Sequence, residues 1–266
     1  MNWLIDFIFP PLCPMCGRPV DRHGLMCAEC WNRFDWITDP MCEKCGYPFP
    51  ADTGVGLLCP ECAKKKKTPL DWMRAAAVYD GASRNAMLPF KHGGRLEFRD
   101  FMSNAMKNIL RDFPAPACGG GKDSLGERGS GSQTQTRANP SESWVGADLL
   151  LLPVPLAFRR LWHRGYNQAA LLAKPLARAL GCDIDYDSVK RKYRKDMGHK
   201  NAKERAANIR GVFSVVKPEH IRGRRILLVD DVFTTGATFN ELAKVLKKSG
   251  ALWVGGITFC RTVKAI

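Results

Sequence analysis

The most continuous hydrophobic runs in this chain are short and lack the alternation of a half-exposed strand. Uninterrupted apolar runs of this length are typical of strands covered on both faces, because a strand with one wet face alternates apolar and polar residues. We therefore expect buried strands at residues 75–79, 149–152, 212–216, 226–229 and 253–260.

Amphipathic segments lie between these runs. Apolar residues recur at helical spacing in 98–113, 168–180 and 239–248, and Gly181 follows the second segment as a C-terminal stop signal. Apolar strands that alternate with helices indicate a mostly parallel sheet with helices on both faces, which is an α/β fold.

Two regions depart from this pattern and suggest the domain organisation. Residues 114–143 are rich in Gly, Ser, Pro, Gln and Thr with almost no bulky apolar side chain, so we expect a disordered insertion. Residues 1–68 hold eight cysteines and many turn residues. The predicted division is a cysteine-rich module at 1–68 and an α/β domain at 69–266.

The composition adds a class of partner. Lys and Arg number 41 against 26 Asp and Glu, a formal net charge of +15, which favours polyanions such as nucleic acid or phosphorylated molecules. The N-terminal apolar run lacks a basic start and is interrupted by Asp6, unlike a signal peptide. No stretch approaches the ~20 apolar residues that span a bilayer. We expect no membrane insertion and a reducing, cytoplasmic location with free thiolates.

The eight N-terminal cysteines form four C-x-x-C pairs, and two such pairs complete a tetrahedral shell of thiolates. Tandem pairs predict structural zinc, one or two ions, ahead of iron–sulfur ligation or disulfides. Sequential pairing would give two ribbons, although interleaved pairing remains open. The ligands are Cys13, Cys16, Cys27 and Cys30 in one ribbon, and Cys42, Cys45, Cys59 and Cys62 in the other.

A shell filled by thiolates leaves no position for substrate or water, so catalysis by this metal is disfavoured. Two roles stay open for the ribbons. They can serve as a structural staple, or as a docking surface for nucleic acid or protein that the Lys run at 64–67 would assist.

The segment 226–238 carries the main candidate chemistry. Asp230 and Asp231 follow the apolar run at the edge where ligands bind in open α/β sheets. The loop that follows offers backbone amides and hydroxyls to a phosphate at a helix N-terminus. Carboxylates next to a phosphate cradle fit a ribose 5-phosphate. The predicted phosphate-binding residues are Thr234, Thr235, Gly236, Ala237 and Thr238.

This segment resembles the 5-phosphoribosyl 1-pyrophosphate (PRPP) motif of type I phosphoribosyltransferases, and the chain outside 114–143 resembles the ComF family of competence-associated zinc-ribbon homologues. The resemblance also covers 79–81 with Arg84, 90–91, 153–155, 164–168, 204–205 with Asn208, and 211–213. It implies the type I phosphoribosyltransferase fold behind an N-terminal double zinc ribbon.

The resemblance further implies roles for individual residues. Asp230 and Asp231 would hold the ribose hydroxyls and serve catalysis, with Mg²⁺ bound alongside PRPP. The loop after residue 152 would lie near the pyrophosphate, through Arg159, Arg160 and Arg164. Family members commonly carry a Gln shortly before the segment that matches 204–205, whereas this chain has 197–199 as Met-Gly-His.

Two functions follow. One is a phosphoribosyltransferase, a pentosyl-transferring glycosyltransferase linked to DNA uptake or nucleotide metabolism, with turnover and acceptor left open. The other is a non-catalytic competence protein that binds nucleic acid and keeps the PRPP site as a regulatory or vestigial site. Single-stranded DNA and other DNA-uptake proteins are the expected partners of this second function, which the basic charge and the ribbons favour.

Overall fold

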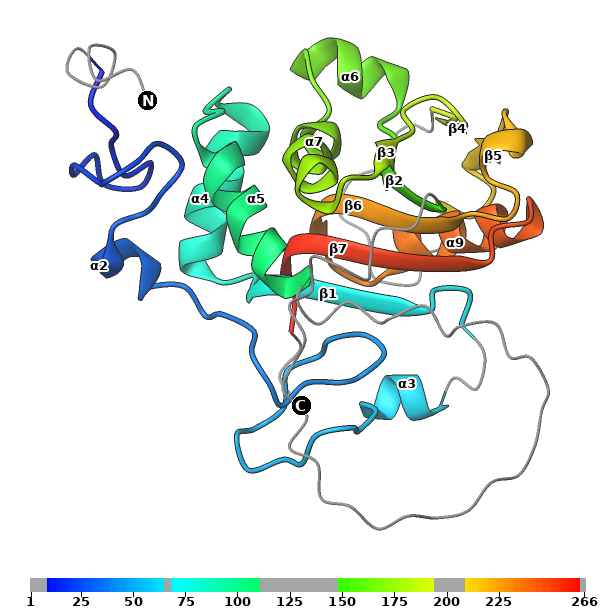
Figure 1. Cartoon of the computed structure of the whole chain (residues 1–266), viewed down its shortest axis with the longest axis horizontal. Helices are drawn as coiled ribbons and strands as arrows, with labels where there is room; N and C mark the ends of the chain where they lie inside the picture. The colour runs from blue at the N-terminus through cyan, green and yellow to red at the C-terminus, as the bar shows by residue number, and fades with distance from the viewer. Residues whose placement is uncertain (1–8, 65–67, 111–147, 194–208, 264–266) are drawn as a thin grey trace.

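The computed structural model describes residues 9–64, 68–110, 148–193 and 209–263 of the chain (Figure 1). Its centre is a five-stranded sheet with the order β1-β7-β6-β2-β3, in which every neighbouring pair is parallel. The strands are β1 (Trp72–Val78), β2 (Leu149–Pro153), β3 (Asp183–Ile184), β6 (Arg225–Phe233) and β7 (Trp253–Arg261). The predicted α/β class with a parallel sheet is confirmed.

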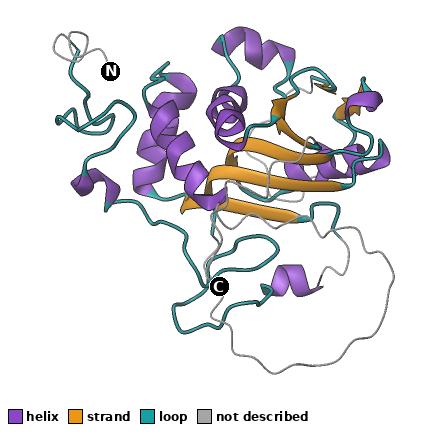
Figure 2. Cartoon of the chain, in the orientation of Figure 1, coloured by secondary structure: helices purple, strands orange, loops and turns teal. Residues whose placement is uncertain are grey.

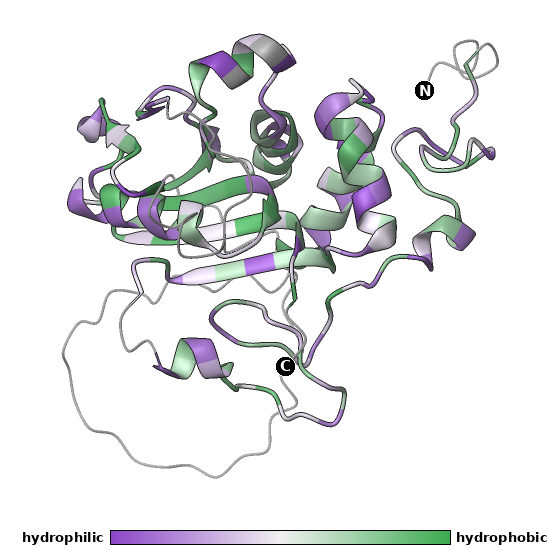
Figure 3. Ribbon diagram, turned by 180° about the vertical axis from the view of Figure 1, so that it is seen from behind, coloured by the Kyte–Doolittle hydropathy of each residue, from purple (hydrophilic) through white to green (hydrophobic). Residues whose placement is uncertain are grey.

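Alternation along the strands divides the apolar side chains between the two faces of the sheet. Leu227 and Val229 of β6 belong to the first core, whereas Ile226 and Leu228 belong to the second. The central strands are hydrophobic along most of their length, as Figure 3 shows. Because both faces are covered, neither set of side chains reaches solvent.

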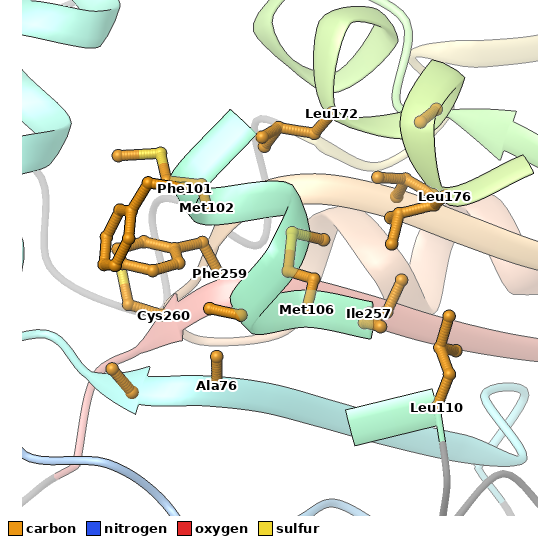
Figure 4. Close-up of a cluster of buried hydrophobic side chains, with 14 of the residues drawn as sticks. Ala76, Phe101, Met102, Met106, Leu110, Leu172, Leu176, Ile257, Phe259 and Cys260 are labelled. Carbon is orange, nitrogen blue, oxygen red and sulfur yellow. The ribbon is translucent and has the colours of Figure 1, made fainter. Parts of the chain in front are cut away.

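The first face is covered by α4 (Gly81–His92), α5 (Phe98–Ile109) and α7 (Gln168–Leu180). Phe101, Met102 and Met106 of α5 pack against Ile257 and Phe259 of β7, and leucines of α7 complete this core (Figure 4). The second face is covered by α9 (Ala237–Lys248).

The boundaries of α7 follow from its sequence. The side chain of Asn167 accepts a hydrogen bond from the Ala169 amide at 3.0 Å, which satisfies one of the free amides at the helix start. Gly181 ends the helix with φ of 60°, a left-handed conformation that glycine adopts without a steric penalty. The prediction of a helix at 168–180 is confirmed.

Other predicted elements differ from the structure. The strand predicted at 226–229 continues through both aspartates to Phe233, because its backbone keeps pairing with β7 as far as Arg261. The strand predicted at 212–216 is β5 (Phe213–Val215), and it pairs antiparallel with β4 (Val189–Arg191) in a separate two-stranded sheet. The pattern did not predict α4, which contains Pro89, or the short α6 (Phe158–Arg164).

The cysteine-rich module consists mostly of loops, with the short helices α2 (Ala28–Trp31) and α3 (Pro60–Lys64) (Figure 2). It covers the edge strand β1. The amide of Ile37 donates to the carbonyl of Ala76 at 2.9 Å, and the amide of Met73 donates to the carbonyl of Lys44 at 2.9 Å. An uncovered edge strand would present these groups to other chains, so the module caps the sheet.

The remaining described element is a 3₁₀ turn at Pro218–His220. None of the helices in the described ranges has the length and apolar character needed to span a bilayer. The predicted insertion at 114–143 lies outside the described residues, as do 197–199 and 204–208, and the division at residue 68 stays a prediction.

Candidate phosphate site and metal centres

The two aspartates lie at the carboxyl end of β6 and point to opposite faces of the sheet, since successive side chains of a strand alternate. Asp231 is buried on the face covered by α4, whereas Asp230 is partly exposed. The amide of Asp231 donates a hydrogen bond of 2.9 Å to Oδ1 of Asp230. The two carboxylates are therefore adjacent but have different surroundings.

Asp231 is paired with a lysine that the sequence reasoning did not assign to the site. Nζ of Lys91, on the last turn of α4, lies 3.0 Å from Oδ2 of Asp231. Burial disfavours the charged lysine, yet the neighbouring carboxylate outweighs it and raises the pKa of Lys91 above its usual value. Lys91 therefore keeps its positive charge beside Asp231. The pattern could not reveal it, because α4 itself was not predicted.

Asp230, in contrast to Lys91, is driven by its surroundings toward its neutral form. Partial removal of its carboxyl from water, followed by the negative charge of Asp231, raises the pKa of Asp230 to about 7. A carboxyl group poised near neutral pH is typical of functional sites. It can accept a hydrogen bond from a ligand hydroxyl once it loses its proton.

The loop after β6 is a short bend of three residues, and α9 begins at Ala237. The side chains of Thr234 and Thr235 are exposed, and Ala237 and Thr238 form the first turn of the helix. The residue before α9, Gly236, has no side chain that could cap the helix amides, and the amide of Ala237 donates only a long bond of 3.4 Å to Oγ1 of Thr235. An anion could therefore bind at this helix start. The predicted phosphate residues thus gather at one helix start.

Gly236 is required at this turn for two reasons. Its φ of 72° is left-handed, a conformation that is costly for residues with a Cβ atom. A Cβ atom there would also lie 2.7 Å from Cζ of Phe233, which forms the floor of the loop.

The segment at 164–168 supports the lysine from the opposite side. The hydroxyl of Tyr166 donates to the carbonyl of Phe90 at 2.6 Å, and Nε2 of Gln168 donates to the carbonyl of Lys91 at 3.2 Å. Arg164 in turn donates to Oε1 of Gln168 at 3.3 Å. This segment therefore fixes the end of α4 and, through it, the Lys91–Asp231 pair.

The predicted pyrophosphate side is α6, which follows β2 at the same edge of the sheet. Arg159 is exposed and lies over the ring of Tyr193, with Cζ 5.0 Å from the ring centroid. Arg164 is half-buried against Gln168, and the side chain of Arg160 lies outside the described part. That these arginines contact pyrophosphate stays a prediction.

The eight N-terminal cysteines form two separate clusters of four. In each, the sulfur atoms lie within 4.8 Å of one another, and the pairing is sequential rather than interleaved. The clusters are Cys13, Cys16, Cys27 and Cys30, and Cys42, Cys45, Cys59 and Cys62.

These clusters fit zinc. A tetrahedral ion with Zn–S bonds of about 2.3 Å places its sulfurs about 3.8 Å apart, and the pairs Cys16–Cys27 and Cys45–Cys59 both lie at 3.6 Å. A hydrogen bond from the Cys45 thiol lowers the pKa of Cys42, and bonds from backbone amides lower it further. Burial acts in the opposite direction, and the pKa of Cys42 is about 4. A thiolate already stabilised by amides is a preformed metal ligand.

Comparisons with known proteins agree with this geometry. Residues 4–65 match the model of the double zinc ribbon domain, and residues 167–264 match the model of the phosphoribosyl transferase domain. The second match includes β6, the loop and α9.

Two of three similar proteins span nearly the whole chain. A DNA utilization protein, YhgH of Escherichia coli, is 31% identical over 253 residues, which is 95% of this chain and 91% of YhgH. Competence protein ComFC of Bacillus subtilis is 27% identical over 94% of this chain and 78% of its own. Competence protein F of Haemophilus influenzae is 44% identical over 38% of this chain and 44% of its own.

Proposed function

Because this chain belongs to the ComF family, with competence protein F, ComFC and YhgH, we propose that it binds PRPP at residues 230–238 and transfers the phosphoribosyl group. The observation that carries this proposal is the junction of β6 and α9. A carboxyl group with a pKa of about 7 adjoins a loop of exposed hydroxyls and the start of a helix that its glycine cap residue leaves uncapped. One ligand that has both hydroxyls and a phosphate fits this arrangement.

In the proposed mode of binding, Asp230 accepts hydrogen bonds from the ribose hydroxyls, and the loop at 234–238 binds the 5-phosphate. Asp231 stays paired with Lys91 and keeps the end of β6 in place. Arg159 lies on the pyrophosphate side at the start of α6. Bound Mg²⁺ supplies positive charge to the pyrophosphate oxygens.

Transfer breaks the bond between the anomeric carbon and the pyrophosphate oxygen, and the acceptor's lone pair forms the new bond to that carbon. Pyrophosphate leaves with the electron pair of the broken bond, and the acceptor loses its proton. The carboxylates at the end of β6 stabilise the positive charge that develops on the sugar.

Pyrophosphate release tests this function. Zinc-loaded protein supplied with PRPP and Mg²⁺ is expected to release pyrophosphate, with water as the acceptor. Asp230→Ala/Asp231→Ala is expected to lose the release, because the ribose loses Asp230 and the end of β6 loses its ion pair with Lys91. The control is Asp183→Ala, which removes an 81% exposed carboxylate from β3. Undiminished release by the double variant would reject the assigned site.

The pKa of Asp230 gives a second prediction. Below pH 7 the carboxyl is protonated and accepts from a ribose hydroxyl only weakly, without the negative charge that strengthens the bond. PRPP affinity is therefore expected to fall up to about tenfold per pH unit. The phosphates of PRPP titrate near pH 6 as well. The readout is therefore the difference in pH slope between wild type and Asp230→Asn from pH 5.5 to 8, and equal slopes would contradict the assignment.

The raised pKa of Asp230 also makes the free energy of unfolding depend on pH. The folded pKa is raised, so the native state holds a proton that the unfolded chain releases between the usual aspartate value and about pH 7. The free energy of unfolding therefore falls as pH rises through this window. Asp230→Asn is expected to remove that fall, as urea unfolding at pH 5 and 8 would show.

A second candidate function, single-stranded DNA binding, is favoured by the surface of α6. Phe158 and Trp162 are 72% and 82% exposed, and their ring centroids are 6.3 Å apart. The helix sequence has three arginines and no acidic residue. Exposed aromatic rings beside cations are a platform for unpaired bases, and the relatives include a DNA utilization protein.

Phe158→Ala/Trp162→Ala is expected to weaken binding of a labelled oligothymidine by about 30-fold or more, because each of the two lost stacks is worth about 1–3 kcal/mol. Fluorescence anisotropy at several salt concentrations measures the affinity. The salt slope should stay unchanged, since no cation is removed. Leu252→Ala, at a 68% exposed leucine, is the control. Unchanged affinity in the double variant would exclude α6 as the DNA surface.

A further inference from the structure

A buried arginine lies between the second metal cluster and the phosphate loop. Arg261 is the last residue of β7, and only 5% of it is exposed. In the parallel register it is opposite Phe233, the last residue of β6. It therefore occupies the junction from which the phosphate loop departs.

On one side Arg261 contacts the second ribbon, which we define as residues 41–64. Its guanidinium donates a hydrogen bond to the carbonyl of Cys45, one of the four cysteines of that cluster. Its Cζ also lies 5.4 Å from the ring centroid of Tyr47. Arg261 is thus fixed to the backbone of a metal-ligating residue.

On the other side Arg261 contacts the floor of the phosphate loop. Its Cζ lies 5.3 Å from the ring centroid of Phe233, the ring that Gly236 approaches so closely. The next residue, Thr262, donates from its amide to the carbonyl of Phe233 at 2.9 Å, and from its hydroxyl to the carbonyl of Thr234 at 3.3 Å. A shift of Arg261 would displace both the ring and the loop backbone.

The charge of Arg261 needs an explanation, because buried charges are normally paired. Among the described residues no carboxylate forms an ion pair with it, and its Nε has no hydrogen-bond partner. One ion with two positive charges and four thiolates carry a net charge of about −2. The adjacent metal–thiolate cluster is therefore a suitable counter-charge.

We propose that Arg261 is a positioning residue that couples metal occupancy of the second ribbon to sugar-phosphate affinity of the loop at 234–238. This inference rests on the proposed function, because it takes that loop as the phosphate site. With metal bound, the carbonyl of Cys45 and the cluster charge hold the guanidinium against Phe233, and the loop keeps its anion-binding shape. Without metal this support is lost.

Coupling of two sites is reciprocal, so a ligand in the loop must raise the affinity of the second ribbon for its metal by the same factor. The first ribbon is an internal control. Its described contacts with the body of the protein, such as the bond from Arg95 to the carbonyl of Pro14, lie near α5 rather than at the loop.

The experiment measures the extent of zinc release at equilibrium from the full, zinc-loaded chain to a competing chromogenic chelator, with and without saturating ribose 5-phosphate. Cys16→Ser identifies the share of released zinc that belongs to the first ribbon. We expect ribose 5-phosphate to reduce release from the second ribbon, as a zinc affinity about five- to tenfold higher, a typical coupling factor. Release from the first ribbon should not change. Calorimetry should show the same factor as tighter ribose 5-phosphate binding by zinc-loaded protein than by stripped protein.

Arg261→Met is expected to bind ribose 5-phosphate more weakly and to lose the effect on zinc release, and Arg261→Lys, the milder change, to retain part of it. Arg225→Met is the matched control, since it removes a guanidinium that is 8% exposed and stacked on Trp253 at the opposite end of β6. That variant should keep the full effect.

The outcomes are distinguishable. If ribose 5-phosphate binds wild type but does not change zinc release, the coupling is wrong and the proposed function stands. If Arg261→Met keeps the full effect, as Arg225→Met should, Arg261 does not carry it. If zinc-loaded wild type does not bind ribose 5-phosphate at all, both the coupling and the proposed phosphate site are overturned.

Discussion

Lys91→Met is expected to destabilise the folded chain by about 3–5 kcal/mol, the usual cost of leaving one partner of a buried ion pair uncompensated. Lys91 and Asp231 lie 3.0 Å apart, with side chains that are 21% and 8% exposed. The free energy of unfolding in urea, measured on zinc-loaded protein, gives the loss. Lys91→Met/Asp231→Leu should recover most of it, because an apolar pair leaves no unpaired buried charge.

Lys247→Met is a matched control for this loss. Lys247 pairs with Asp71 at 2.7 Å, but these side chains are 34% and 28% exposed. Water compensates a partly exposed carboxylate, so this variant should lose much less. Equal losses in the two lysine variants would show that the burial of Asp231 does not matter, and the support proposed for the end of β6 would fail.

Removal of metal is expected to have the largest effect on the cysteine-rich module. Structural zinc contributes on the order of 10–16 kcal/mol to modules that have little core of their own. The second ribbon also covers β1 through the Met73–Lys44 bond. Chelation should therefore unfold the ribbons and expose the edge of the sheet. Hydrogen exchange should then show lost protection at the amides of Ile37 and Met73.

Metal content provides the direct measurement. We expect two zinc ions per wild-type chain and one in Cys42→Ser, since the clusters share no ligand. Cys182→Ser, outside both clusters, should keep two. A single ion per wild-type chain, or two ions in Cys42→Ser, would contradict the assignment of two four-cysteine sites.

The parts of the fold that local rules determine were predictable. The helix α7 has a polar residue that caps its start and a glycine that ends it, so both boundaries follow from sequence. The cysteine pairs bring their ligands together within short loops, and their sequential clustering agrees with the repeated spacing. Each of these features depends on neighbours along the chain.

Features that depend on distant residues were not predictable. The apolar run ends at Val229, yet β6 continues because Asp230 and the residues after it still pair with β7. The partner of Asp231 comes from α4, which has no clear periodic pattern. Sequence places the two aspartates side by side, whereas the strand turns them to opposite faces and gives one a buried lysine and the other a pKa of about 7.

The central claim is that the junction of β6 and α9 binds a sugar phosphate, and calorimetric titration with PRPP and Mg²⁺ tests it most directly. Wild type should bind one PRPP per chain, and Asp230→Ala should lose most of the affinity while the Lys91–Asp231 pair stays intact. No heat of binding in wild type, or equal affinity in Asp230→Ala, would contradict the claim.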